Sequence, residues 1–408
     1  MATSDTRARR GPRHSAERGG HPLARGLLVA LVGVLAFTGA GAAFAYQSLQ
    51  SGIQRHDVDR FLGSDRPTRE PANPDDPNAG NEYNILVMGS DSREGDNQDI
   101  GGGDFPGMRS DTTLLVHIAA DRSRVDVVSI PRDLVVDIPS CTLPDGTETQ
   151  PRLEGQGWSD QDRMWNVPFF LGGSTGDVAA AAACTWRTFE NMTDVRVDDF
   201  VVVDMAGMER MVDAIGGVEM CFDEDLYSAQ AKLDVSAGCH TLDGETAVAF
   251  ARARKGEGLG DGSDIGRIGR QQELLTNMVD QVLERNILTE SGELYRFLQA
   301  ATSSLTTGDE IGNLTTMAGL GYSLRNIGMA DVNFATVPFD WAGNRVRPNY
   351  LSEELWDSIR ADEPMALPED QQDDADDEDA SDETSDETTG ESADGSGTTD
   401  TGNADGQG

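Results

Sequence analysis

The stretch TTLLVHIAADRSRVDVVSI, residues 112–130, predicts two β-strands joined by a tight turn. In the first strand Leu114, Val116 and Ile118 alternate with other residues, which places them on one face because strand side chains alternate with a period of two. Residues 124–130 form the second apolar run, and the short ADRS connection favours an antiparallel hairpin. The stretch therefore predicts the centre of a β-sheet.

On both sides of this stretch, short apolar strands alternate with amphipathic helices. The pattern predicts an α/β (α+β) fold in which helices flank a central mixed β-sheet. Strands are expected at residues 83–90, 198–205 and 330–338, and helices at 206–217 and 270–286, while residues 246–254 fit either structure.

The N-terminal residues have the composition of a membrane anchor. Residues 1–25 carry six arginines, and residues 26–46 then run 21 residues without a charge. At 1.5 Å per residue this run crosses a hydrocarbon core of about 30 Å, and it is longer than the apolar part of a typical signal peptide. We expect an uncleaved transmembrane helix in the cell membrane, with a cytoplasmic N-terminus and an extracytoplasmic remainder. A cleaved signal peptide is the alternative.

The remainder divides by composition into three segments. Residues 47–80 move into a Pro/Asn/Asp-rich linker, residues 81–367 form the predicted globular domain, and residues 368–408 form an acidic tail that we expect to be disordered. The tail holds 16 acidic residues and no basic ones, a large part of the net charge of −40. So acidic a chain lacks the basic surface that nucleic-acid binding needs.

All four cysteines follow the predicted anchor. An even number in an oxidising compartment indicates two disulfides, for which three pairings exist. Pairing Cys141 with Cys184 and Cys221 with Cys239 closes the shortest loops. We expect this pairing rather than a metal site, because no C-x-x-C spacing occurs.

Arginine and aspartate recur where the predicted strands end. One such cluster is more often a surface ion pair of little energetic value, but five clusters in a chain with only 32 basic residues favour a shared site. The clusters are Asp91 and Arg93 in GSDSR, Arg109 and Asp111 in RSDTT, Arg132 and Asp133 in SIPRDL, Arg252 and Arg254 in ARAR, and Asp264, Arg267, Arg270 and Gln271 in DIGRIGRQQ.

These residue types suit a phosphate ligand. In an extended segment, two arginines spaced two residues apart present planar forks to one face, a geometry that fits a pyrophosphate. Asp91 and Asp111 are suited to hold one Mg²⁺ (or Mn²⁺) together with waters and phosphate oxygens. Arg267 and Gln271 would stand near the N-terminus of a helix, which also attracts anions. Ser–His–Asp catalysis has little support, because His117 lies in an apolar strand and no G-x-S-x-G motif occurs.

In this order, the motifs GSDSR, RSDTT, SIPRDL, IGGVEMCF, HTLDGETAVAFARAR and DIGRIGRQQ resemble the LytR–CpsA–Psr (LCP) family of bacterial cell-wall enzymes. The likeness covers roughly residues 83–286. The Ala-, Gly-, Asp- and Arg-rich composition suggests a high-G+C bacterium, which favours the actinobacterial type. The resemblance implies a membrane-anchored, Mg²⁺-dependent phosphotransferase. It would move a glycopolymer from a polyprenyl-pyrophosphate carrier onto peptidoglycan, forming a phosphodiester and releasing polyprenyl phosphate.

The resemblance also implies roles for individual residues. Asp91 and Asp111 would bind the metal, and the stretches 200–212 and 274–283 would line a pocket for the lipid tail. The residues implied to hold the pyrophosphate are Arg93, Arg109, Arg132, Arg252, Arg254, Arg267, Arg270, Gln271 and Asn166. Those implied to act in catalysis are Arg132, Arg252, Arg254, Arg267 and Asp133, the last by orienting Arg132 or by acting near the acceptor hydroxyl.

The sequence departs from the family pattern in two places. An N-A-A-Y-like segment is replaced by WNVPFFLGG (165–173), which keeps Asn166, and the Gly-rich residues 94–107 are longer than the pattern needs and could cover the site. Two other functions use the same residues. One is a Mg²⁺-dependent phosphatase or pyrophosphatase acting on polyprenyl pyrophosphates, and the other is a membrane-anchored, non-enzymatic lipid-phosphate-binding regulator.

Overall fold

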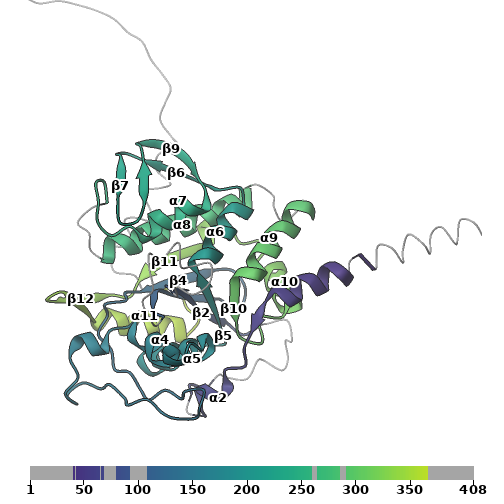
Figure 1. The fold of residues 1–408 in the computed structure, drawn as a ribbon. Helices are drawn as coiled ribbons and strands as arrows, with labels where there is room; N and C mark the ends of the chain where they lie inside the picture. The colour runs from purple at the N-terminus through teal and green to yellow at the C-terminus, as the bar shows by residue number, and fades with distance from the viewer. Residues whose placement is uncertain are drawn as a thin grey trace, which may run out of the picture. The chain divides into compact units, whose positions relative to one another are not determined.

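The predicted strand at residues 83–90 is the central strand β2 (Tyr83–Ser90) of a mixed seven-stranded sheet (Figure 1). The computed structural model describes residues 40–41, 43–64, 66–68, 80–91, 108–259, 264–284 and 291–365. In sheet order the strands are β1 (Gln54–Arg55), β10 (Leu305–Thr307), β5 (Asp199–Asp204), β2, β3 (Ser110–Ile118), β4 (Val125–Ile130) and β11 (Val332–Thr336). β2 is parallel to β5 and antiparallel to β3, and β3 and β4 form the predicted hairpin.

Alternating side chains of β2 build a core on each face of the sheet. Leu86 and Met88 are fully buried in the larger core, whereas Ile85 and Val87 belong to a smaller core on the opposite face. Because both faces are covered, β2 reads as a continuous apolar run rather than as a half-exposed strand.

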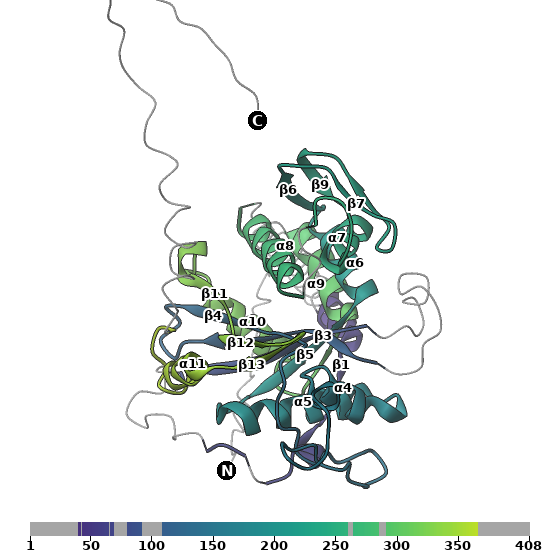
Figure 2. The ribbon, with the colours of Figure 1, turned by 90° about the vertical axis from the view of Figure 1, so that its left-hand side faces the viewer.

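Helices that cover the larger core lie on one side of the sheet (Figure 2). They are α2 (Asp59–Leu62), α4 (Val167–Gly172), α5 (Val178–Thr193) and α11 (Tyr350–Arg360), accompanied by the short turns η1 (Asp160–Arg163) and η2 (Gly173–Thr175). The alanine run Ala179–Ala183 of α5 is buried, so the neighbouring α4 can approach closely. A Cβ atom at Gly172 would collide with the backbone carbonyl oxygen of Ala180.

The other side of the sheet carries a second layer with its own apolar core. Its helices are α6 (Met205–Ala214), α7 (Gly244–Arg252), α8 (Asp264–Glu284), α9 (Ser291–Ser304) and α10 (Leu314–Ser323), with η3 (Met329–Asp331) after them. Its small sheets pair β6 (Val218–Phe222) with β9 (Gly238–Leu242) and β7 (Leu226–Ser228) with β8 (Leu233–Val235). Elsewhere, β12 (Phe339–Ala342) and β13 (Arg345–Pro348) form a hairpin.

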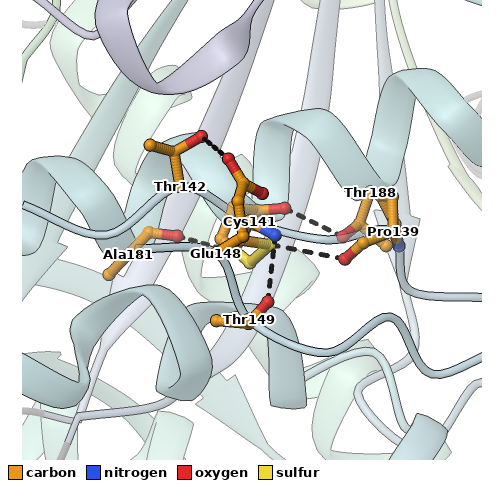
Figure 3. Close-up of a disulfide and its surroundings, with 9 residues drawn as sticks. Pro139, Cys141, Thr142, Glu148, Thr149, Ala181 and Thr188 are labelled. Carbon is orange, nitrogen blue, oxygen red and sulfur yellow. Dashed lines mark hydrogen bonds between the residues drawn. A yellow bond between two sulfur atoms is a disulfide. The ribbon is translucent and has the colours of Figure 1, made fainter. Parts of the chain in front are cut away.

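Both predicted disulfides are present. Cys141 is bonded to Cys184 and ties the loop after residue 139 to α5, as Figure 3 shows beside Thr149, whose hydroxyl accepts a hydrogen bond from the Cys141 N–H at 2.9 Å. Cys221 and Cys239 face each other directly in the β6–β9 pair.

Several sequence expectations need correction at their boundaries. The helix predicted at 270–286 begins at Asp264, and residues 246–254, which fitted either structure, are helical from Gly244 to Arg252. Arg252 and Arg254 are therefore not an extended pair. Within the described residues no helix has the length and apolar character needed to cross a membrane. The predicted span 26–46 and the tail 368–408 lie largely or wholly outside the described residues.

Two glycines provide a stability test of this packing. Gly172→Ala should destabilise the fold by about 1–3 kcal/mol, because the new methyl group must displace backbone atoms of α5. Gly319→Ala, in the exposed helix α10 with open space around it, should stabilise by about 0.5–1 kcal/mol through helix propensity. Urea unfolding of both variants measures the difference. Equal midpoints would show that the α4–α5 contact is not tightly packed.

Candidate anion-binding site

A cavity of about 360 Å³ lies where β2 and β5 end and β3 begins. Ligands of α/β proteins commonly bind at the carboxyl ends of parallel strands, and β2 and β5 are such a pair. The residues that line it are Gly89, Ser90, Asp91, Arg109, Asp111, Thr112, Arg132, Asn166, Val203, Asp204, Met205, Met208, Ser228, Gln230, Ala231, Val248, Ala251, Arg252, Arg254, Arg267 and Gln271.

A β-bulge places Asp111 in this cavity. Gly89 pairs with Thr112 and Ser90 with Ser110, so Asp111 has no partner on β2. In a regular strand Asp111 and Thr112 would point to opposite faces, yet both line the cavity. The bulge redirects the carboxylate, a common use of bulges beside functional sites.

Three arginines from different segments converge on the Asp111 carboxylate. Arg254 Nη2 lies 2.7 Å from Oδ2, Arg132 Nη1 lies 3.2 Å from Oδ1, and Arg267 Nη1 lies 3.6 Å from Oδ2. Burial raises the pKa of Asp111, but the positive charges of Arg132, Arg267 and Arg254 outweigh burial and hold this pKa below its usual value. Asp111 is therefore ionised at neutral pH and keeps the three guanidinium groups together.

The cavity is positively charged although the chain is acidic. Five arginines and three aspartates line it, an excess of two positive charges, in a chain with a net charge of −40. Guanidinium forks bind phosphate oxygens in pairs. An anion with several oxygens is the ligand that fits this charge.

The first two turns of α8 hold the arginines in place. Gln271 accepts a hydrogen bond from the Thr112 hydroxyl at 2.9 Å and donates to the Ala251 carbonyl at 3.2 Å, so it bridges β3 and α7. Arg270 donates to the carbonyls of Leu259 and Ala253, next to Arg254. Both side chains hold neighbouring backbone segments together, and Gln271 also lines the cavity.

One side of the cavity is apolar. Val203 is the next-to-last residue of β5, Met205 and Met208 come from α6, and Val248 and Ala251 come from α7. Of the two stretches expected to line a lipid pocket, residues 200–212 contribute to the cavity. Within 274–283, by contrast, Leu274 belongs to the second core.

Two further predicted residues lie around Arg132. Asp133 Oδ1 is 3.6 Å from Arg132 Nε, but Asp133 is not among the lining residues. Asn166 lines the cavity and is only 6% exposed, and its Oδ1 atom has no hydrogen-bond partner among the described residues. A buried amide oxygen of this kind is available to a ligand.

The structure thus brings most of the predicted site residues together. Asp133 and Arg270 stand behind the cavity wall, and Arg93 and the Gly-rich segment 94–107 lie outside the described residues. Those that line the cavity are Asp91, Arg109, Asp111, Arg132, Asn166, Arg252, Arg254, Arg267 and Gln271.

Outside the recognised motifs, sequence reasoning did not single out three polar lining residues, Asp204, Ser228 and Gln230. Asp204 could have been found, because it ends β5 as Ser90 ends β2, and the two residues pair in the parallel register. Ser228 and Gln230 had no comparable signal, because Ser228 ends and Gln230 follows a strand of only three residues, too short to be recognised.

The donor set fits a magnesium ion bound together with phosphates. Asp91 and Asp111 both line the cavity, and Mg²⁺ is usually held by one or two carboxylates plus waters and phosphate oxygens. An ionised carboxylate has about four acceptor positions, so Asp111 retains capacity beside its arginine contacts. Within the described part of the chain no three His, Cys, Asp or Glu side chains form a metal-binding group. Waters and phosphate oxygens would complete the coordination.

The fold is a mixed sheet flanked by helices, and the cavity at its strand ends combines arginines with apolar side chains. The LytR_cpsA_psr family model matches residues 46–358. The chain therefore belongs to the LytR–CpsA–Psr family, as the sequence motifs predicted.

Named relatives agree with this membership. The probable cell wall biosynthesis protein LcpB of Corynebacterium glutamicum is 31% identical over 242 residues, 58% of this chain and 51% of the relative. TagU of Enterococcus faecalis, named a polyisoprenyl-teichoic acid–peptidoglycan teichoic acid transferase, is 28% identical over 281 residues, 68% of this chain and 76% of the relative. The matched region spans only 51% and 61% of the length of LcpB and of the cell wall biosynthesis protein LcpA from the same organism.

A solved structure shares the fold. The LytR-Csp2A-Psr enzyme from Actinomyces oris superposes with a TM-score of 0.51 at 20% identity, covering 75% of this chain and 95% of that one. The mixed sheet flanked by helices is thus the architecture expected for the family.

Replacing Asp111 tests the charge balance of the site. Asp111→Asn should destabilise the fold by about 1–3 kcal/mol at pH 7, because three arginines lose their shared counter-charge. Since the pKa of Asp111 is lowered in the folded state, its contribution is present above the unfolded pKa of about 3.9 and is lost as the pH falls below it. The difference from wild type in urea unfolding should therefore shrink toward pH 3.

Asp309→Asn is the matched control, because Asp309 is exposed in the loop after β10. It should change stability little at either pH. An Asp111→Asn protein as stable as wild type at pH 7 would contradict the proposed charge balance.

Proposed function

We propose that this protein is a Mg²⁺-dependent phosphotransferase that moves a glycopolymer from a polyprenyl-pyrophosphate carrier onto peptidoglycan. The observation that carries the proposal is the convergence of Arg132, Arg254 and Arg267 in a cavity whose other side is apolar. A pyrophosphate joined to a hydrocarbon chain has this combination of charge and apolar surface. The name of the relative TagU, a transferase between a polyisoprenyl-linked polymer and peptidoglycan, supports the same substrate class.

The chemistry needs positioning and charge neutralisation. A peptidoglycan hydroxyl attacks the phosphorus that carries the glycan, a new P–O bond forms, and the P–O bond of the pyrophosphate bridge breaks. Polyprenyl phosphate leaves with the bonding electron pair, and the hydroxyl proton passes to water or to a cavity carboxylate. Arg132, Arg254 and Arg267 would stabilise charge on the phosphates, a role suited to preorganised groups in a partly buried site.

Further residues support this site in the proposal. Arg109 and Arg252, which also line the cavity, would add positive charge, and Asn166 would bind a phosphate or hydroxyl group. Asp133 would orient Arg132 through the contact at Nε. Asp91 and Asp111 would hold Mg²⁺ (or Mn²⁺), which neutralises phosphate charge when bound.

The sequence supports a location for the proposed activity. A helix at residues 26–46 would anchor the protein in the cell membrane with its N-terminus in the cytoplasm. The cavity would then stand outside the cell, in the compartment where peptidoglycan is found and where disulfides form.

A transfer assay tests the proposal. The full chain in detergent would be given a labelled polyprenyl-pyrophosphate glycan, Mg²⁺ and peptidoglycan fragments. Wild type should move label onto peptidoglycan, chelation of Mg²⁺ should stop transfer, and Arg254→Ala should reduce the rate by about 10²–10³-fold, as expected for loss of one charge-stabilising group.

Arg347→Ala is the matched control. The two arginines have similar ion pairs and exposure: Arg347 lies 2.8 Å from Asp160 and is 37% exposed, and Arg254 lies 2.7 Å from Asp111 and is 40% exposed. Arg347, however, does not line the cavity. Its loss should leave transfer nearly unchanged. Release of labelled sugar phosphate without transfer would instead indicate a hydrolase, and tight binding without turnover a binding module.

A further inference from the structure

Two helices without a charged residue lie next to each other at one end of the protein. They are the N-terminal helix, residues 43–52, and α10. Tyr46 Oη is 3.5 Å from Thr315 Oγ1, and the Gln50 side chain donates to the Gly312 carbonyl at 2.9 Å and accepts from the Leu314 N–H at 3.0 Å. Figure 1 shows the purple N-terminal helix beside α10. Because charged residues make up 25% of the chain, this shared surface is unusually neutral.

The same surface exposes large aromatic side chains. Phe44 is 75% exposed, Tyr46 46% and Tyr322, on α10, 69%. The inner side of α10 packs Met317 and Leu320 against the smaller core, yet no α10 residue is buried. Exposed apolar patches of this kind mark interaction surfaces.

We propose that the N-terminal helix and α10 lie in the headgroup layer of the membrane. Phe44 and Tyr46 lie at the C-terminal end of the apolar residues 26–46, and aromatic residues are enriched at membrane–water interfaces. The contact between Tyr46 and Thr315 places the start of α10 at the same depth in the membrane interface as Tyr46. At the other end of α10, the Arg325 guanidinium lies 4.2 Å above the Tyr322 ring, where a cation can reach lipid phosphates. A net charge of −40 would repel an anionic membrane, so a neutral surface is the part able to approach it.

This contact would fix the cavity relative to the membrane. The N-terminal helix reaches the end of α9, where a Cβ atom at Gly52 would stand 3.4 Å from Thr302 Oγ1. The end of α9 in turn contacts α6, because Arg210 Nε of α6 donates a hydrogen bond to Ser304 Oγ at 3.2 Å. α6 supplies Met205 and Met208 to the apolar side of the cavity. This step rests on the proposed function. The contacts from the N-terminal helix through α9 to α6 would hold Met205 and Met208 at a constant height above the bilayer that contains the lipid carrier.

Added tryptophans test the membrane contact without measuring transfer. Tyr322→Trp and Tyr350→Trp would be reconstituted as full chains in vesicles that contain lipids brominated near the headgroup. Tyr350 is the matched control, because it is 76% exposed at the start of α11 and lies outside the proposed surface. Relative to wild type, the added emission of the Tyr322→Trp variant should lose about half its intensity, whereas that of Tyr350→Trp should not be quenched.

Two results would overturn the proposal. One is equal, weak quenching of both variants. The other is blue-shifted Tyr322→Trp emission that brominated lipids do not quench, which would place another protein surface there.

A charge substitution gives a second readout. Tyr322→Glu should lower transfer from a long-chain donor in vesicles by about tenfold and leave transfer from a short, water-soluble prenyl donor unchanged, while Tyr350→Glu should affect neither. Equal loss with both donors would contradict a membrane role. Failure of the proposed function would appear differently, as wild-type inactivity with intact quenching.

Discussion

The site depends on one ionised carboxylate that neutralises three guanidinium groups. Asp111 comes from β3, and its partners Arg132, Arg254 and Arg267 come from the loop after β4, the segment after α7, and α8. Without this carboxylate, mutual repulsion would separate the arginines. With it, the cluster remains assembled and retains the excess positive charge that attracts an anion.

The fold keeps the three arginines around Asp111 through backbone geometry as well as through side-chain contacts. The bulge opposite Gly89 and Ser90 points Asp111 into the cavity. Gln271 then joins β3 to α7, and Arg270 holds the backbone next to Arg254. Residues that never touch a ligand thus determine where the guanidinium groups stand, in the way that supporting contacts orient ligands at metal sites.

Sequence patterns predicted the parts of the structure that follow from local periodicity. β2 and the β3–β4 hairpin were recognised because their side chains are apolar over a whole strand length, and both cysteine pairs followed from short loops. Strand-end arginines and aspartates indicated the cavity. Two features were not predictable: the bulge at Asp111, and the contacts of Arg270 with backbone carbonyls rather than with the cavity. Both depend on contacts between segments that are separated in sequence. Roles of individual residues in catalysis remain predictions.

The acidity of the chain and the positive cavity are compatible because they act over different distances. Charges separated by more than about 8–10 Å are largely screened at physiological salt, so the acidic surface has little effect on a phosphate already inside the cavity. It would instead disfavour the approach of a free anion from solution. On the proposed function the donor arrives along the membrane, held by its lipid chain. Delivery in the plane of the bilayer would avoid most of that repulsion. This route needs a neutral surface facing the membrane, the role proposed for the N-terminal helix and α10.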